Sequence, residues 1–256
     1  MTWRRDLMAL IVSVLVLTGC NAAGPVASNG KLTVVSTVSP ITNIIYNIGG
    51  DRINLTGIIP EGTDSHTFEP APSDAKVLAQ ADVIFVNGLK LEEPTVRLAE
   101  ANLKTGAEIV KLGEQTLTPD QYAFDFSFPK ANGNPNPHAW TNPIYALRYA
   151  EIVRDELIKR DAANADVYRK NYTAFKTRID ALDQAIAATL QTIPPQNRKL
   201  LTYHDSFAYF APRYGLTVIG AIQPSDFAEP SAQEVAALIK QVKSEKVPAI
   251  FGSEVF

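Results

Sequence analysis

The chain contains three histidines, and their positions give the first indication of chemistry. His66 lies in a loop after a predicted strand, His138 lies between a Pro/Asn/Gly-rich segment and a predicted helix, and His204 follows another predicted strand. A loop histidine by itself is usually solvated or hydrogen-bonded, but here every histidine lies in a turn at the boundary of an element. Neutral imidazole is a good ligand for zinc and is accepted by manganese and iron. The joint pattern predicts a three-histidine metal site, and the wide sequence separation argues against a small structural zinc knot.

The segments around the histidines alternate between strands and helices. Apolar, β-branched runs predict strands, and helical spacing that begins at proline or ends at glycine predicts helices. The predicted strands are 32–36, 53–59, 82–86, 199–202, 216–222 and 248–252, and the predicted helices are 41–48, 72–80, 206–214 and 230–243. Such alternation implies parallel, doubly wound sheets. Ligands of these sheets bind at the carboxyl ends of strands, which is where His66 and His204 lie.

The same order of elements occurs twice, which predicts two similar lobes. Gly50 has a counterpart in Gly215 and Pro60 in Pro224, at offsets of 165 and 164. Each glycine follows a predicted helix and each proline follows a predicted strand. A cleft between the lobes would bring the histidines of the two lobes face to face.

Between the repeats, apolar residues recur every three or four positions from Tyr168 to Ile193 and predict one continuous helix. A coiled coil would show the same stripe, but no second helix of equal length is predicted to pair with it. We therefore expect a rigid strut that permits only small movements of the lobes. The predicted fold class is α/β, with two (β/α) lobes and parallel sheets joined by one long rigid linker helix, and with a metal cleft between the lobes.

The N-terminal residues have the pattern of a secretion signal. Arg4 and Arg5 precede an apolar run that is too short for a permanent membrane helix. The run ends in Leu-Thr-Gly-Cys at 17–20, a bacterial lipobox, in which cleavage precedes the cysteine and Cys20 receives the lipid. We expect a mature chain outside the cytoplasm, lipid-anchored to the bacterial cell membrane and either periplasmic or at the cell surface.

The domain organisation follows from these segments. We expect a signal peptide at 1–19, a lipid-anchored flexible tether at 20–31, an N-terminal lobe at 32–164, a linker helix at 165–195 and a C-terminal lobe at 196–256. A charged content of 20% is ordinary for a globular protein, and a formal net charge of −3 argues against nucleic-acid binding. One cysteine cannot form an internal disulfide or an iron–sulfur site.

Several motifs together resemble the solute-binding lipoproteins of zinc and manganese ABC importers. They are the lipobox, Gly-Thr-Asp-Ser-His-Thr-Phe-Glu-Pro around His66, Asn-Pro-His-Ala-Trp around His138, and His-Asp-Ser-Phe-Ala-Tyr-Phe from His204. Asn-Gly-Leu at 87–89 and Glu-Pro-Ser at 229–231 also resemble that family, and the similarity runs from about residue 32 to the end. The resemblance implies two (β/α) lobes joined by one long helix, with a divalent metal held by the three histidines.

The resemblance also implies a fourth ligand, a carboxylate close to the C-terminus, for which the chain has no matching residue. Relatives continue beyond the strand at 248–252 with a strand–helix segment that carries it, so we expect a C-terminal lobe that is truncated or uses another group. Asp205 and Glu254 are the candidate substitutes. For Asp205 a helix N-cap is the favoured alternative, and Glu254 is equally well explained as a solvated tail residue.

Residues that we expect to hydrogen-bond the metal ligands also depart from the family pattern. Asn136 and Asn142 stand where relatives often have aspartate, and Ser65 stands where they often have proline. Since a ligating imidazole usually donates its other N–H to a carboxylate or carbonyl, these changes predict a lower metal affinity.

The expected function is capture of a divalent transition metal and its delivery to an ABC permease and, through it, to the ATPase. Three nitrogens with one carboxylate suit zinc, whereas manganese prefers more oxygen, so zinc is favoured over manganese. We expect a monomer that is not an enzyme. Two alternatives stay open: a metal-binding surface adhesin, and a metal-dependent hydrolase with Asp205 as base. No Gly-x-Ser-x-Gly, P-loop or His-Glu-x-x-His motif supports the hydrolase.

Overall fold

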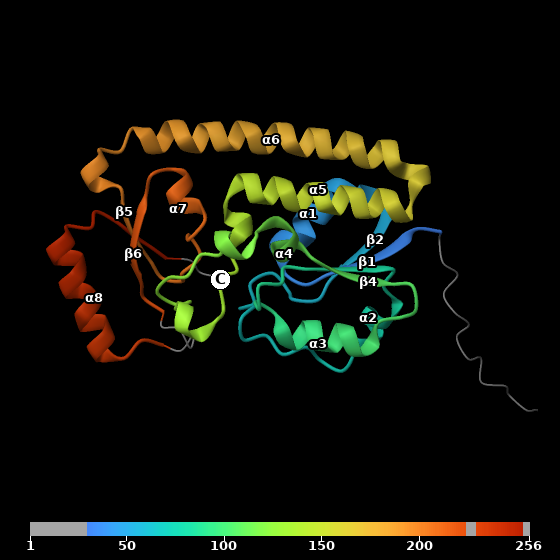
Figure 1. Cartoon of the computed structure of the whole chain (residues 1–256), viewed down its shortest axis with the longest axis horizontal. Coiled ribbons are helices and arrows are strands. Elements are labelled where there is room, and N and C mark those ends of the chain that lie inside the picture. The colour runs from blue at the N-terminus through green and yellow to red at the C-terminus, as the bar shows by residue number, and fades with distance from the viewer. Residues whose placement is uncertain (1–29, 224–228, 253–256) are drawn as a thin grey trace, which may run out of the picture. The chain divides into compact units, whose positions relative to one another are not determined.

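The computed structural model describes residues 30–223 and 229–252 (Figure 1). The signal peptide, Cys20 and Glu254 lie outside these ranges. The described chain has two parallel sheets, and its long helix was predicted from the apolar stripe. Within the described residues, no helix combines the length and the apolar character that crossing a bilayer requires.

The first sheet has four parallel strands in the order β2-β1-β3-β4. Its strands are β1 (Leu32–Ser36), β2 (Ile53–Gly57), β3 (Val83–Val86) and β4 (Glu108–Lys111). Helices α1 (Ser39–Gly49) and α5 (Pro143–Arg160) cover one face, and α2 (Asp74–Gln80) and α3 (Glu93–Asn102) cover the other (Figure 1). Because both faces are covered, all four side chains of the central strand β3 are buried.

The second sheet has three parallel strands in the order β6-β5-β7. They are β5 (Lys199–Thr202), β6 (Thr217–Ala221) and β7 (Ile250–Phe251), accompanied by α7 (Phe210–Arg213) and α8 (Ala232–Glu245). Here β5, β6 and β7 repeat the arrangement of β1, β2 and β3. Gly50 and Gly215 precede the equivalent edge strands with φ of +53° and +69°. The predicted fold class, with two α/β lobes, parallel sheets and a long helix, is confirmed.

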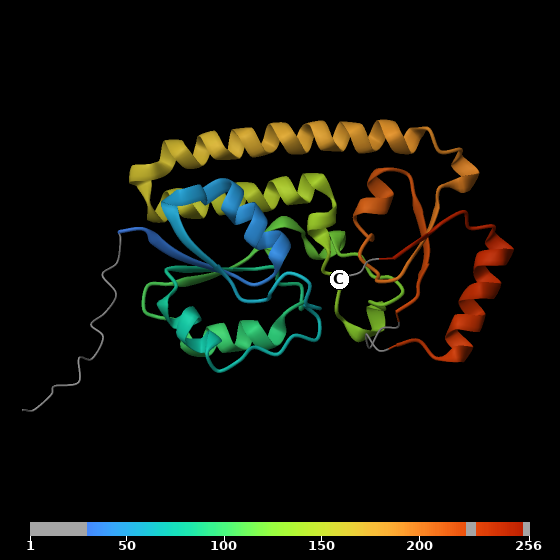
Figure 2. The same ribbon diagram turned by 180° about the vertical axis from the view of Figure 1, so that it is seen from behind.

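The long helix α6 (Ala165–Gln191) has 27 residues and is about 40 Å long. It packs along α5 and α1, which Figure 1 and the reverse view in Figure 2 both show. Asp183 on α6 accepts hydrogen bonds from Arg213 and Tyr214, at the end of α7. The helix therefore contacts elements of both lobes. The sequence did not predict α5 as its antiparallel partner.

Other elements also differ from the sequence predictions. The elements α3, β4 and α4 (Leu112–Thr116) were not predicted, and the predicted helix at 206–214 is reduced to α7. Asp205 does not cap a helix: α7 follows Tyr209, and one carboxylate oxygen of Asp205 accepts from the backbone N–H of Ser127 at 2.9 Å. The favoured N-cap interpretation of Asp205 was therefore wrong. By contrast, Ser231 caps α8 in a capping box with Glu234.

Candidate metal centre

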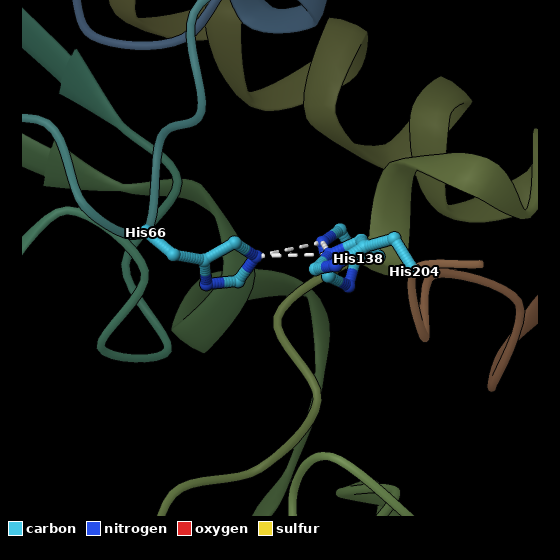
Figure 3. Close-up of side chains that lie close together, drawn as sticks. All are labelled: His66, His138 and His204. Carbon is cyan, nitrogen blue, oxygen red and sulfur yellow. Dashed lines mark hydrogen bonds between the residues drawn. The ribbon is translucent and has the colours of Figure 1, made fainter. Parts of the chain in front are cut away.

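The structure brings the three sequence-predicted histidines together (Figure 3). The Nε2 atom of His66 lies 3.2 Å from that of His138 and 3.1 Å from that of His204, and the last two lie 3.0 Å apart. His66 comes from the loop after β2, His138 from the turn before α5, and His204 from the carboxyl end of β5. Among the histidine, cysteine and carboxylate side chains of the described ranges, these three histidines form the group whose ligand atoms lie close enough together to share one ion. The group contains no carboxylate.

The size of this triangle suits a metal ion. Around a tetrahedral ion with Zn–N bonds of about 2.0–2.1 Å, neighbouring nitrogens lie about 3.3–3.4 Å apart. The observed separations of 3.0–3.2 Å are shorter by a few tenths of an ångström. Rings in this arrangement need little rearrangement to bind an ion slightly out of the plane of the three nitrogens.

Two of the rings are oriented by side-chain amides. The Nδ1 atom of His138 lies 2.8 Å from Oδ1 of Asn136, and Nδ1 of His204 lies 2.6 Å from Oε1 of Gln223. An amide oxygen only accepts, so each ring carries its proton on Nδ1 and presents the Nε2 lone pair to the other two rings. Two such lone pairs at 3.0 Å repel each other, and a cation between them removes that repulsion.

Burial keeps the imidazoles neutral. His138 and His204 are 4% and 5% exposed, while His66 is partly exposed. Burial lowers the pKa of His66 to about 3, with a contribution from neighbouring His204. Burial likewise lowers the pKa of His138, assisted by the other two rings, and that of His204. Neutral imidazole is the form that binds metals, so the site needs no deprotonation at pH 7.

Apolar side chains surround the cluster. Phe128 lies against the rings of His66 and His138, at centroid distances of 5.7 and 5.8 Å, and Trp140 lies 5.2 Å from His138 on another side. A cavity of about 260 Å³ adjoins His138 and His204 and is lined by residues of both lobes. The rings therefore lie at the wall of a cleft between the lobes, as the sequence predicted.

The candidate fourth ligands have different outcomes. Asp205 is fully buried, and its carboxylate faces Ser127 and the neighbouring Asp125 rather than joining the group of Nε2 atoms. Burial and the adjacent Asp205 raise the pKa of Asp125 well above its usual range. Glu254 lies outside the described residues.

The two asparagines at aspartate positions of the family have clear roles. The amide oxygen of Asn136 accepts from His138, as a carboxylate would, while its NH₂ group donates to the backbone oxygen of Asp205 at 2.7 Å. Asn142 accepts from the backbone N–H of Ile144 and caps α5. Gln223, by contrast, was missed, because nothing in the sequence marks a glutamine 19 residues after a histidine as its partner.

A second buried network supports the turn before His138. The side chain of Asn87, after β3, donates to the backbone oxygen of Pro137 at 3.0 Å and accepts from the hydroxyl of Tyr149 at 2.8 Å. Its backbone N–H donates to Glu92, whose carboxyl also accepts from Thr37, both at 2.6 Å. Burial raises the pKa of Glu92 to about 7. The carboxyl ends of β1 and β3 are thereby joined to the turn that carries His138.

Comparison with known proteins identifies the class as the metal-binding, substrate-binding proteins of ABC transporters. The chain belongs to the ZnuA family, described as "Zinc-uptake complex component A periplasmic", which matches residues 34–256. The resemblance inferred from the motifs is thus confirmed.

Individual relatives differ in the metal that their names give. The chain is 31% identical to the metal ABC transporter substrate-binding lipoprotein FimA of Streptococcus parasanguinis and to the manganese ABC transporter substrate-binding lipoprotein PsaA of Streptococcus anginosus. Both alignments cover 96% of this chain and 80% of the relative. The solved periplasmic zinc-binding protein TroA of Treponema pallidum superposes with a TM-score of 0.79 and 27% identity, over 89% of this chain and 79% of TroA.

Proposed function

We propose that this chain captures a divalent transition metal at His66, His138 and His204, with zinc preferred over manganese, and delivers it to an ABC permease for import. The observation that carries the proposal is the convergence of three Nε2 atoms within 3.2 Å of one another. Two of these atoms present lone pairs because their rings are held at Nδ1 by amide oxygens. Such a triangle is a poor arrangement for free imidazoles and a good one for a cation.

The preference for zinc follows from the donor atoms. Three neutral nitrogens suit zinc, whereas manganese favours oxygen ligands. The relatives do not decide the question, since PsaA is named for manganese and TroA for zinc. Zinc also binds more tightly than manganese to most sites, so the informative quantity is the ratio of the two affinities.

The test is metal binding by the full-length chain, purified in detergent. Competition against a chromogenic chelator gives the zinc and manganese affinities of the wild type and of a variant with His66, His138 and His204 all replaced by alanine. We expect the triple variant to lose zinc binding, and Asp180→Asn, a control that alters only an exposed ion pair with Lys176 on α6, to keep it. Undiminished zinc binding by the triple variant would contradict the proposed site. Tighter binding of manganese than of zinc would contradict the preference.

Delivery and anchoring need cellular tests. We propose that the mature chain is held outside the cytoplasm by lipid on Cys20 and works with a permease and its ATPase, as substrate-binding proteins of ABC importers do. Labelled palmitate should be incorporated into the wild type and not into Cys20→Ala. Zinc-limited growth should depend both on this chain and on the permease. Metal-dependent growth that survives loss of the permease would argue against delivery to it.

A further inference from the structure

We propose that His138 and His204 form a preassembled pair whose separation is fixed by Asn136, Ser127 and Gln223, and that His66 is the ligand that closes the site on the ion. This inference rests on the proposed function, since it assigns an order to the ligands of that site. It makes Asn136 a positioning residue for two ligands at once.

Asn136 connects the two histidines of the pair. Its Oδ1 atom accepts from the backbone N–H of His138 at 3.0 Å and lies 2.8 Å from Nδ1 of the same residue. Its Nδ2 atom donates to the backbone oxygen of Asp205 at 2.7 Å, in the residue that directly follows His204. Because Asn136 is fully buried, this one amide fixes the distance between the two histidines without competition from water.

Ser127 and Gln223 make a second connection. The hydroxyl of Ser127 donates to the backbone oxygen of Gln223 at 2.9 Å, and its backbone N–H donates to the carboxylate of Asp205 at 2.9 Å. The side chain of Gln223 lies 2.6 Å from Nδ1 of His204. The same serine therefore holds the partner of the His204 ring and the residue next to that ring.

The segment before His138 is also fixed to its surroundings. The hydroxyl of Tyr209 donates to the backbone oxygen of Asn136 at 2.9 Å and accepts from the backbone N–H of Ala123 at 3.1 Å. On the other side, Asn87 donates to the backbone oxygen of Pro137. The turn that carries His138 is thus bonded to the second lobe and to the first, so its position relative to His204 does not depend on His66.

His66 has a different setting. It lies between β2 and α2, at 58–73, where the described chain forms turns rather than a helix or strand. Its backbone N–H donates to Asp64 two residues earlier at 2.8 Å, which makes a local turn, and its ring lies against Phe128 and the other two imidazoles. In Figure 3 it approaches the pair from the opposite side. Its side chain is also more exposed than theirs.

Single substitutions separate the pair from the closing ligand. Zinc and cobalt affinities, and the rate of metal release to a chelator, are measured for the full-length His66→Gln, His138→Gln and His204→Gln variants. We expect His66→Gln to keep measurable cobalt binding with faster release, and the other two variants to lose it. Equal losses in all three variants would overturn the preassembled pair.

Asn136 is tested against a matched asparagine. Asn136→Ala should weaken zinc binding by roughly 10–100-fold and change the visible spectrum of bound cobalt, which reports ligand geometry. Asn136→Asp keeps the acceptor for His138, but it replaces the donor with a carboxylate oxygen that faces the backbone oxygen of Asp205 and the carboxylate of Asp125, so it should also weaken zinc binding. Asn142→Asp keeps its helix cap and loses a donor to the backbone oxygen of Tyr209, so it serves as the control and should bind zinc normally.

The outcomes distinguish the two proposals. An unchanged affinity and cobalt spectrum in Asn136→Ala, or an equal loss in Asn142→Asp, would overturn the positioning role while the proposed function stands. If the wild type binds neither zinc nor cobalt, the proposed function itself fails. Unfolding midpoints of all variants show whether a loss of binding reflects a loss of folding, and Asn136→Asp then carries the comparison.

Discussion

The two lobes repeat one order of strands and helices, but they differ in how many apolar side chains they bury. Helix α1 of the first lobe buries Ile41, Ile44, Ile45 and Ile48, whereas α8 of the second lobe has no buried residue. On α8 and β7, Ile239 and Ile250 are 50% and 55% exposed. Within the described residues, the large apolar cluster lies mainly in the first lobe, and the second lobe buries fewer apolar side chains, among them Leu200, Leu201 and Ile219. A shared topology does not imply a shared source of stability.

The largest test of this contrast compares the same substitution in the two lobes. Ile45→Ala, in the first core, should lower the free energy of unfolding by about 2–5 kcal/mol, because it leaves a cavity. Ile239→Ala, on half-exposed α8, should change it by about 0.5 kcal/mol or less. Urea denaturation followed by circular dichroism measures both. Similar costs at the two positions would show that the lobes are equally well packed.

The buried carboxyl of the first lobe should make stability depend on pH. The pKa of Glu92 is raised from 4.5 to about 7, so the folded state holds this proton more tightly than the unfolded state. The stability this provides is complete below about pH 4.5 and is lost as the pH rises to about 7. The free energy of unfolding of Glu92→Gln, relative to that of the wild type, should therefore rise by up to about 3 kcal/mol between pH 4.5 and 8.

The control for this prediction is the difference between the two proteins at each pH, which cancels the titration of all other groups. Metal is removed with a chelator beforehand, so that the histidine site does not contribute. A difference that stays constant from pH 4.5 to 8 would mean that Glu92 is ionised throughout.

Zinc should reduce the difference in stability between the two lobes, because its proposed ligands come from both. At a free zinc concentration of 100 times Kd, the unfolding free energy should rise by about 2.7 kcal/mol. A chelator should reverse the gain, and His66→Gln should reduce it at equal zinc concentration. Hydrogen exchange in β5 and β6 should slow on zinc addition. Unchanged exchange there would mean that the ion does not stabilise the second lobe.

The smallest expected effect concerns the contact between α6 and the second lobe. Asp183→Asn removes a charged acceptor shared by Arg213 and Tyr214 and should cost about 1 kcal/mol. Asp180→Asn, on the same helix, removes only an exposed pair with Lys176 and should cost about 0.3–0.5 kcal/mol. Thermal unfolding of the two variants gives the comparison, and a reversed order would show that the Asp183 contact does not hold the second lobe.

The sequence predicted those parts of the fold that depend on local pattern. The strands at 32–36 and 199–202 match β1 and β5 residue for residue, because buried parallel strands are short apolar runs. The apolar stripe from Tyr168 to Ile193 predicted α6, which begins at Ala165 and ends at Gln191, two residues before the end of the stripe. The amphipathic helix α5 was missed, and the helix after His204 was predicted too long, because Asp205 is used by Ser127 across the fold.

The candidate site also contains some residues that the sequence reveals and others that only the tertiary structure reveals. The three histidines could be found because their residue type and their positions at element boundaries are visible in the sequence. The amides that orient them were harder to find: Asn136 was identified only as a departure from aspartate, and Gln223 has no sequence signal at all. Partners of this kind are fixed by tertiary hydrogen bonds, and no local pattern encodes them.

The neutral character of Asn136 and Gln223 has an electrostatic consequence. A carboxylate at either position would cancel part of the charge of a bound ion, whereas an amide oxygen orients the ring and cancels none. Among the described residues, the three imidazoles that would touch the ion and the two amides that orient them carry no negative charge to compensate its double positive charge. Loaded and empty forms then differ by a charge in a buried, low-dielectric setting, where its field is poorly screened. A membrane partner could distinguish them by electrostatic potential as well as by shape.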